Sequence, residues 1–309
     1  MILFLILLLI CATIYTLFYF IYYFVFRHPV KKRPDPHHIP SGPLYEDHKE
    51  KMLRVVEDMA SAPHEDLEQT SYDGHRLHAR LYRFSEGPQP LVLFFHGYHG
   101  IAEWDGFGMY QICKKLGYSI LMPDMRAHGK SEGDISFGLR ERFDVAQWIS
   151  YAVQRFGADT KIILAGVSMG ATSILLATGE LSLPSNVAGI ISDCAFSHPS
   201  GILRPFYEQK RLPAKFLFTL MCLAAKLFGH VDLKKPSAIE VIQKLQLPVL
   251  FLHGTEDFIV PVTMCHDLYE ACSSEKQKAI FENANHANCA LSDFERYETV
   301  VLTFLTSIL

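Results

Sequence analysis

The sequence predicts an α/β fold, in which a mainly parallel sheet is covered by helices on both faces. Three observations lead to this prediction. Short apolar runs, which are typical of strands buried on both faces, alternate along the chain with helical stretches. The pentapeptide Gly166-Val167-Ser168-Met169-Gly170 stands between one such run and a helical stretch. Residues Met1 to Phe26 carry no charged side chain, which adds a membrane-spanning helix before the domain.

The apolar N-terminal segment, Met1 to Phe26, is long enough to cross a membrane. As a helix it would extend about 39 Å, against a hydrocarbon core of ~30 Å. Tyrosines gather in its second half, where a membrane interface would lie: Tyr15, Tyr19, Tyr22 and Tyr23. A cleaved signal peptide fits less well, because no basic residue precedes the apolar run and no small-x-small site follows it. We therefore predict a single-pass anchor over residues 1–26.

A basic, proline-rich segment over residues 27–47 follows the anchor. Its proline-rich part, 34–43, is typical of a stiff, extended linker. Four fixed positive charges stand just after the anchor, at Arg27, Lys31, Lys32 and Arg33. The positive-inside rule places this flank, and with it the catalytic domain, on the cytoplasmic side of the cell membrane. Seven cysteines without a C-x-x-C pair fit free thiols in a reducing compartment, although translocation of so large a domain stays open.

Charge and composition exclude several function classes. The formal net charge of −4, with basic residues scattered beyond the linker, argues against a nucleic-acid partner. The cysteines and histidines show no spacing that is typical of a zinc site, so we expect no metal. No organic cofactor is expected either. Residues 48–309 are enough for one large domain with a sizeable core.

The elements of this domain are expected in a regular order. An amphipathic helix over 48–60 precedes a hairpin, whose strands over 67–72 and 77–84 flank the turn Asp73-Gly74. Apolar residues at three-to-four spacing predict a helix over 139–156. The remaining strands are expected at 90–95, 119–122, 161–165, 187–192, 248–252 and 278–281.

The interval 197–245 interrupts the strand–helix rhythm. It includes residues 216–225, which are apolar on nearly every side. Extra core packing is one interpretation. We favour a helical cap insertion with an apolar underside, because the interval falls between two strands on the side where substrates enter such sheets.

The serine in the glycine-framed turn becomes a nucleophile only with a base and a group that orients the base. Such a strand-to-helix turn exposes the Ser168 hydroxyl and places it near a helix N-terminus. Asp257 follows the strand at 248–252, and His286 follows the strand at 278–281. Carboxyl ends of parallel strands share one edge of a sheet, so these three side chains are expected to meet.

Together these motifs resemble the α/β-hydrolase fold superfamily, in its serine-hydrolase branch. Within it the chain is most similar to the bacterial membrane-anchored hydrolases of the lysophospholipase, monoacylglycerol-lipase and serine-aminopeptidase-like group. The stretch Pro123 to Ser131 resembles that group's D-x-R-G-H-G-x-S loop, with Ala127 in place of the usual glycine. The resemblance implies that Ser168 is the nucleophile, Asp257 the acid and His286 the base. Asp193, at the end of another strand, is the alternative acid.

An oxyanion hole needs two N–H donors aimed at the developing charge. One follows the nucleophile, at Met169. The resemblance puts the other at Tyr98, in the loop after the strand at 90–95, and leaves its neighbour His99 as an alternative.

The expected reaction is hydrolysis of a carboxylic ester through an acyl-enzyme, without metal or cofactor. The apolar insertion and the anchor favour a small-molecule ester with an apolar acyl chain, or a lipid-derived ester. A peptidase or a thioesterase would use the same triad. A non-catalytic binding protein on the same scaffold is the alternative of another class.

Overall fold

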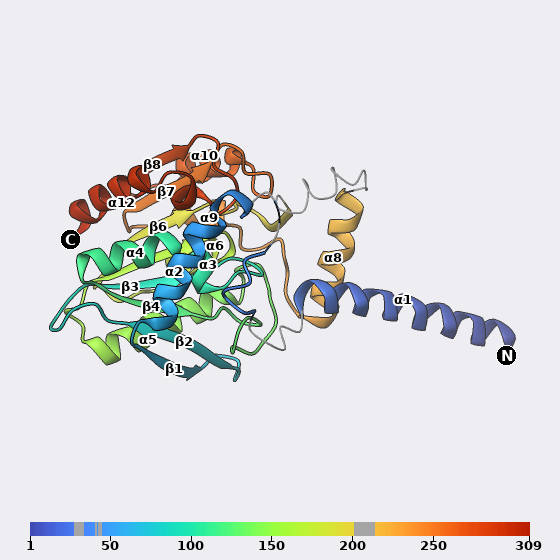
Figure 1. Ribbon diagram of the computed structural model, residues 1–309. Helices are drawn as coiled ribbons and strands as arrows, with labels where there is room; N and C mark the ends of the chain where they lie inside the picture. Colours follow the sequence, from blue (N-terminus) through green and yellow to red (C-terminus); the bar gives the residue numbers. More distant parts are fainter. Residues whose placement is uncertain (28–33, 41, 43–44, 201–213) are drawn as a thin grey trace.

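The computed structural model describes residues 1–27, 34–40, 42, 45–200 and 214–309 (Figure 1). Within these residues eight strands form one sheet in the order β1-β2-β4-β3-β5-β6-β7-β8. β1 and β2 run antiparallel, and β3 to β8 pair in parallel. The prediction of a mainly parallel sheet is thus confirmed. The strands are β1 (His64–Thr70), β2 (Arg76–Tyr82), β3 (Leu91–Phe95), β4 (Ser119–Pro123), β5 (Ile162–Val167), β6 (Val187–Asp193), β7 (Val249–Gly254) and β8 (Lys276–Phe281).

Helices cover both faces of the sheet. On one face lie α5 (Glu141–Phe156), α6 (Met169–Glu180), α9 (Ala238–Ile242) and α10 (Val262–Ala271). The other face carries α2 (Lys49–Ser61), α4 (Phe107–Leu116) and α12 (Phe294–Ile308). The short elements η1 (Glu46–His48), α3 (Ala102–Asp105) and α11 (Cys289–Ser292) lie in connections.

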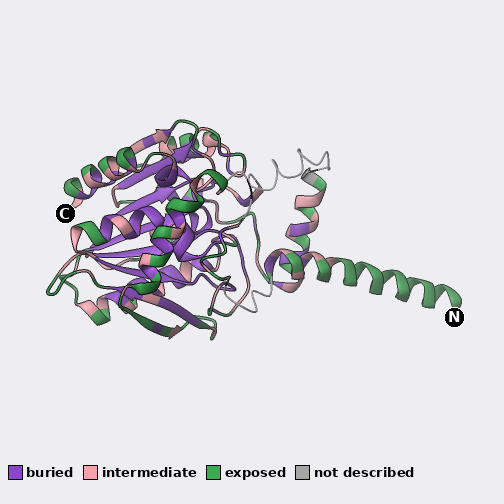
Figure 2. Ribbon diagram, viewed as in Figure 1, coloured by how far each residue is buried: buried purple, intermediate pink, exposed green. Residues whose placement is uncertain are grey.

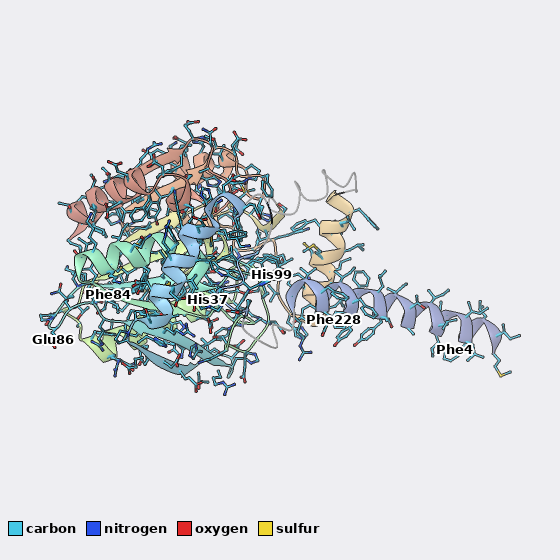
Figure 3. All side chains as sticks on the ribbon, in the orientation of Figure 1. Phe4, His37, Phe84, Glu86, His99 and Phe228 are labelled. Atoms are coloured by element: carbon cyan, nitrogen blue, oxygen red, sulfur yellow. The ribbon has the colours of Figure 1, made fainter. Side chains whose placement is uncertain are left out.

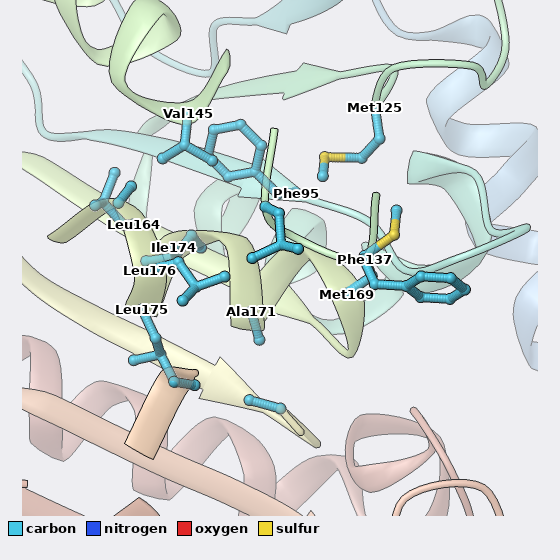
Figure 4. Packing of buried hydrophobic residues seen from close by; sticks show 14 of the residues in the cluster. Phe95, Met125, Phe137, Val145, Leu164, Met169, Ala171, Ile174, Leu175 and Leu176 are labelled. Atoms are coloured by element: carbon cyan, nitrogen blue, oxygen red, sulfur yellow. The ribbon is translucent and has the colours of Figure 1, made fainter. Parts of the chain in front are cut away.

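Two hydrophobic cores result from this arrangement, one on each face. Successive side chains of a strand point to opposite faces. Accordingly Leu91, Leu93 and Phe95 of β3 join the core beneath α5 and α6, while Val92 and Phe94 join the core beneath α2 and α4. Figure 4 shows how the side chains of α6 pack in the first of these cores. Because α6 is held on the sheet along its whole first half, its N-terminus is fixed at the end of β5.

The N-terminal helix α1 (Ile2–Phe26) extends away from the sheet domain (Figures 1 and 2). It is long and apolar enough to cross a membrane, although a signal sequence has the same length and composition. Helix α8 (Ala214–Phe228) packs against it. The Phe228 ring lies 5.0 Å from the ring of Tyr15 and 5.5 Å from that of Tyr19, at the junction seen in Figure 3.

Parts of the expected anchor and linker lie on the domain. Tyr22 and Phe26, at the end of α1, are 4% and 1% exposed and belong to the core beneath α5 and α6. In the segment expected to be a linker, Ile39 is buried and the Trp104 indole N–H donates to the carbonyl of Pro36 at 2.9 Å. These contacts of the helix end and of the proline-rich segment have no local sequence signal, so they could not be predicted from the sequence.

The predicted cap, 197–245, falls partly on residues 201–213, which lie outside the described residues. Its described part contains α8 and α9. Helix α9 packs against α6, and a Cβ on Gly179 of α6 would lie 2.6 Å from the carbonyl oxygen of Val241. The insertion therefore contributes to the core at its C-terminal end.

Candidate active site

Ser168 stands on the turn between β5 and α6, with φ 52° and ψ −114°. This positive φ is costly for a residue with a side chain, so the surrounding structure must impose it. Space explains the flanking glycines. A Cβ on Gly170 would lie 2.1 Å from the carbonyl oxygen of Phe95, and one on Gly166 would lie 2.8 Å from a backbone nitrogen of α6. The N–H of Ser168 donates to the carbonyl of Asp193 at 2.8 Å, which ties the turn to β6.

The structure brings the three predicted side chains into one hydrogen-bonded chain. His286, in the loop after β8, places Nε2 3.0 Å from the Oγ of Ser168. Its Nδ1 lies 2.7 Å from Oδ2 of Asp257, in the loop after β7. A carboxylate only accepts, so Nδ1 carries the proton and Nε2 is left to accept from the serine hydroxyl. The arrangement can therefore transfer a proton from Ser168 to His286.

Asp257 is held as a carboxylate by its surroundings. Its Oδ1 accepts from the N–H groups of Ile259 and Val260, at 2.9 and 2.7 Å. Burial alone would raise the pKa of Asp257, but hydrogen bonds from His253 and His286 outweigh it and lower the pKa to about 2. The carboxylate is thus charged at neutral pH and can stabilise a protonated His286.

His253, on β7, is a second histidine on the same carboxylate, which the sequence analysis did not single out. Its Nε2–H donates to the carbonyl of Val260 at 2.8 Å and lies 3.2 Å from Oδ2 of Asp257. Burial lowers the pKa of His253, but the hydrogen bond to Asp257 outweighs it and raises the pKa to about 10. The sequence signal that could have identified His253 is its position at the end of a strand, four residues before Asp257.

The loop after β3 carries the predicted second oxyanion donor. The N–H of His99 donates to Nε2 of His128 at 2.9 Å, so this donor already has a partner. Among the hydrogen bonds of the described residues, none uses the N–H of Tyr98 or of Met169. Met169 is the first residue of α6, where helix N–H groups have no partner within the helix.

Three side chains that could ligate a metal ion lie close together at this site. Cys194, Asp257 and His286 have potential ligand atoms within 4.8 Å of one another. Burial raises the pKa of Cys194 well above its usual range, which leaves a neutral thiol and a poor ligand. Asp257 and His286 are bound to each other. A surface cavity of about 610 Å³ between α2, α4 and α12 shares no lining residue with this site.

Asp193, the alternative acid, lies at the end of β6 and accepts from the thiol of Cys289 at 3.3 Å. Burial raises the pKa of Asp193 to about 6. Because this pKa is raised, the folded protein binds the proton of Asp193 more tightly than the unfolded chain does. The resulting contribution to the free energy of unfolding is fully present below about pH 4 and is lost as the pH rises towards 6. We compare the free energy of unfolding of Asp193→Asn with that of the parent. This difference should shift in favour of the variant by about 2 kcal/mol between pH 4.5 and pH 7.5. Urea unfolding at the two pH values measures this difference, and an equal effect at both would contradict it.

Comparisons with known proteins agree with the fold. Residues 90–220 match the model of the alpha/beta hydrolase fold family. An uncharacterized protein of Bacillus subtilis, YqkD, is 30% identical over 195 residues, which cover 62% of this chain and 64% of YqkD. Lysophosphatidylserine lipase ABHD12 of Danio rerio is 27% identical over 203 residues, 62% of this chain and 49% of the lipase.

Among solved structures, the esterase Pf2001 of Pyrococcus furiosus superposes with a TM-score of 0.66 at 20% identity. The superposition covers 81% of this chain and 95% of the esterase. At this level of identity it shows a shared fold and nothing about activity. The sheet order, the serine turn and the family match all lead to one assignment. This chain has the α/β-hydrolase fold.

Proposed function

We propose that the chain is a serine hydrolase that cleaves carboxylic esters with an apolar acyl chain. The observation that carries the proposal is the hydrogen-bonded chain from Asp257 through His286 to Ser168, on a turn whose φ is positive. Each distance is within hydrogen-bond range. The match to the alpha/beta hydrolase fold family and the similarity to a lysophosphatidylserine lipase support the reaction class.

In the proposed reaction, His286 carries the proton at each step. His286 Nε2 takes the hydroxyl proton while the Oγ of Ser168 attacks the ester carbonyl carbon. The resulting oxyanion is placed to accept from the N–H groups of Tyr98 and Met169. His286 then gives the proton to the departing alkoxide, which leaves an acyl-enzyme. Water attacks the acyl group by the same route and regenerates Ser168.

We assign helix α1 the role of a single-pass membrane anchor, with the catalytic domain on the cytoplasmic side. Its residues 2–14 are exposed, and all of them except Thr13 have apolar side chains. Helix α8 extends this apolar surface: it packs on α1 and exposes three large side chains, Phe216, Leu223 and Leu227. An active site fixed beside such a surface meets lipid-derived esters at high local concentration, which supports the apolar acyl preference.

Lysines in the middle of the exposed part of α1 should remove the chain from membranes. Each lysine at the centre of a span costs about 2.5–3.5 kcal/mol, so replacing both Ile10 and Ile14 should abolish integration. The measurement is the share of full-length protein that stays in the membrane pellet after alkaline carbonate. The double alanine variant at the same positions is the control and should stay in the pellet. A pelleted lysine variant, or a mature chain that lacks residues 1–26, would contradict the anchor.

Hydrolysis of p-nitrophenyl esters by the full-length chain in detergent tests the proposed reaction. The full chain is needed because Tyr22 and Phe26 belong to the buried core. Hydrolysis that is lost in Ser168→Ala supports the proposal. Equal rates for the two proteins would refute it.

A further inference from the structure

The last two turns of α1 are fixed to the catalytic domain. The hydroxyl of Tyr22 donates to the Asp134 carboxylate at 2.6 Å. The carbonyl of Phe26 accepts from the N–H of Ile135 at 2.7 Å. The last four carbonyls of a helix have no partner within the helix, so a donor from outside satisfies one of them here. Figure 2 shows the change from exposed to buried residues along α1.

The same helix end contacts the loop that carries the proposed oxyanion donor. The hydroxyl of Tyr98 donates to the carbonyl of Val25 at 3.3 Å. The ring of Phe137 lies between the two elements, 5.3 Å from the ring of Tyr98 and 5.8 Å from that of Phe26. Burial raises the pKa of Tyr98 to about 12, so its phenol keeps the proton that it donates. In Figure 3, His99 of this loop lies on the side of the domain that faces α1.

The loop is fixed at both neighbours of Tyr98 as well. The N–H of Gly97 donates to the buried carboxyl of Asp105 at 2.7 Å, and the N–H of His99 donates to His128 at 2.9 Å. Backbone bonds therefore hold the loop before and after Tyr98, and the side chain of Tyr98 supplies a third fixed point on α1. The direction of the Tyr98 N–H depends on all three.

We propose that residues Tyr22–Phe26 of α1 position the oxyanion loop through Tyr98 and Phe137, so that the anchor helix is part of the catalytic apparatus. The inference rests on the proposed serine-hydrolase function. An oxyanion donor acts only when it is aimed at the developing charge, and a misplacement of about 1 Å is costly. A loosened helix end would therefore weaken stabilisation of the transition state more than binding of the substrate.

Two variants of the full-length protein in detergent test the inference. Tyr98→Phe removes the hydroxyl and keeps the backbone donor, and Phe26→Ala removes the ring beneath Phe137. Loss of a direct donor costs about 10²–10³ in kcat. Displacing one should cost less: about three- to tenfold for Tyr98→Phe and about tenfold or more for Phe26→Ala, with KM within twofold. Phe26→Leu should restore most of the loss.

The matched control is Tyr151→Phe on α5, whose ring packs on Trp148. A trifluoromethyl ketone gives the second readout, because its adduct with Ser168 carries an oxyanion that needs the same donors. Its inhibition constant should rise by the factor by which kcat/KM falls, which a merely structural defect would not produce. If Phe26→Ala lowers the midpoint of thermal unfolding, the inference is judged from the kinetics of Tyr98→Phe only.

The outcomes separate the inference from the proposed function. If the parent protein hydrolyses esters in a Ser168-dependent way but Tyr98→Phe keeps kcat within twofold of Tyr151→Phe, the inference is overturned and the function stands. If the parent shows no Ser168-dependent hydrolysis, the proposed function itself fails.

Discussion

Ser168→Ala should lower kcat for ester hydrolysis by on the order of 10⁴-fold or more. The substitution removes the proposed nucleophile, and it removes the hydroxyl that lies 3.0 Å from Nε2 of His286. What remains is the oxyanion hole and substrate binding, which support slow hydrolysis by water. Initial rates with p-nitrophenyl butyrate, for full-length protein in detergent, measure the loss.

Ser173→Ala is the control for this substitution. Ser173 lies on the same helix, is fully buried and donates to the carbonyl of Met169 at 2.6 Å. Removing the Ser173 hydroxyl should change kcat only a few-fold. A fluorophosphonate should form its adduct at Ser168 in the parent and in Ser173→Ala, and labelling at another serine would contradict the assigned nucleophile.

Asp257→Asn should lower kcat by on the order of 10³–10⁴-fold. A neutral amide cannot stabilise the imidazolium of His286, and its NH₂ group can force the ring into the wrong tautomer. The carboxylate also receives two backbone N–H groups and faces His253. The variant should therefore be less stable as well, which thermal unfolding measures alongside the rate.

Asp193→Asn is the matched control, because Asp193 is also a buried carboxyl at this edge of the sheet and was the alternative acid. Its Oδ1 accepts from Cys289, and its carbonyl, which the substitution keeps, accepts from Ser168. We expect its kcat to stay within about tenfold of the parent, far from the loss expected for the Asp257 variant. A ranking in the opposite order would make Asp193 the acid.

The fold could be predicted from the sequence because its signals are local. The continuous apolar run of β3 supplies both cores by alternation, so its five residues indicate a strand buried on two faces. Gly166 and Gly170 are required by contacts within the turn and with the adjoining strand. The chain order of Asp257 and His286 after their strands then places both at the edge where Ser168 lies.

Other contacts have no local signal. Tyr22 suits a membrane interface as well as a protein core, because both environments accept an aromatic ring with a polar group at its edge, and the apolar ring of Phe26 suits lipid as well as a core. The sequence therefore assigned them to the anchor, and only their partners Asp134 and Phe137, over a hundred positions away, show otherwise. The sequence also left His99 as an alternative to Tyr98, and only the hydrogen bond from His99 to His128 distinguishes the surroundings of the two residues.

By itself, the sequence determined the sheet, the serine turn and an apolar helix long enough to cross a membrane, because strand alternation, turn sterics and helix length act between near neighbours. The tertiary structure decided which acidic side chain meets His286, where a second histidine stands, and that the end of α1 contacts the loop after β3. These depend on distances between segments far apart in the chain, and the packing of both cores fixes those distances.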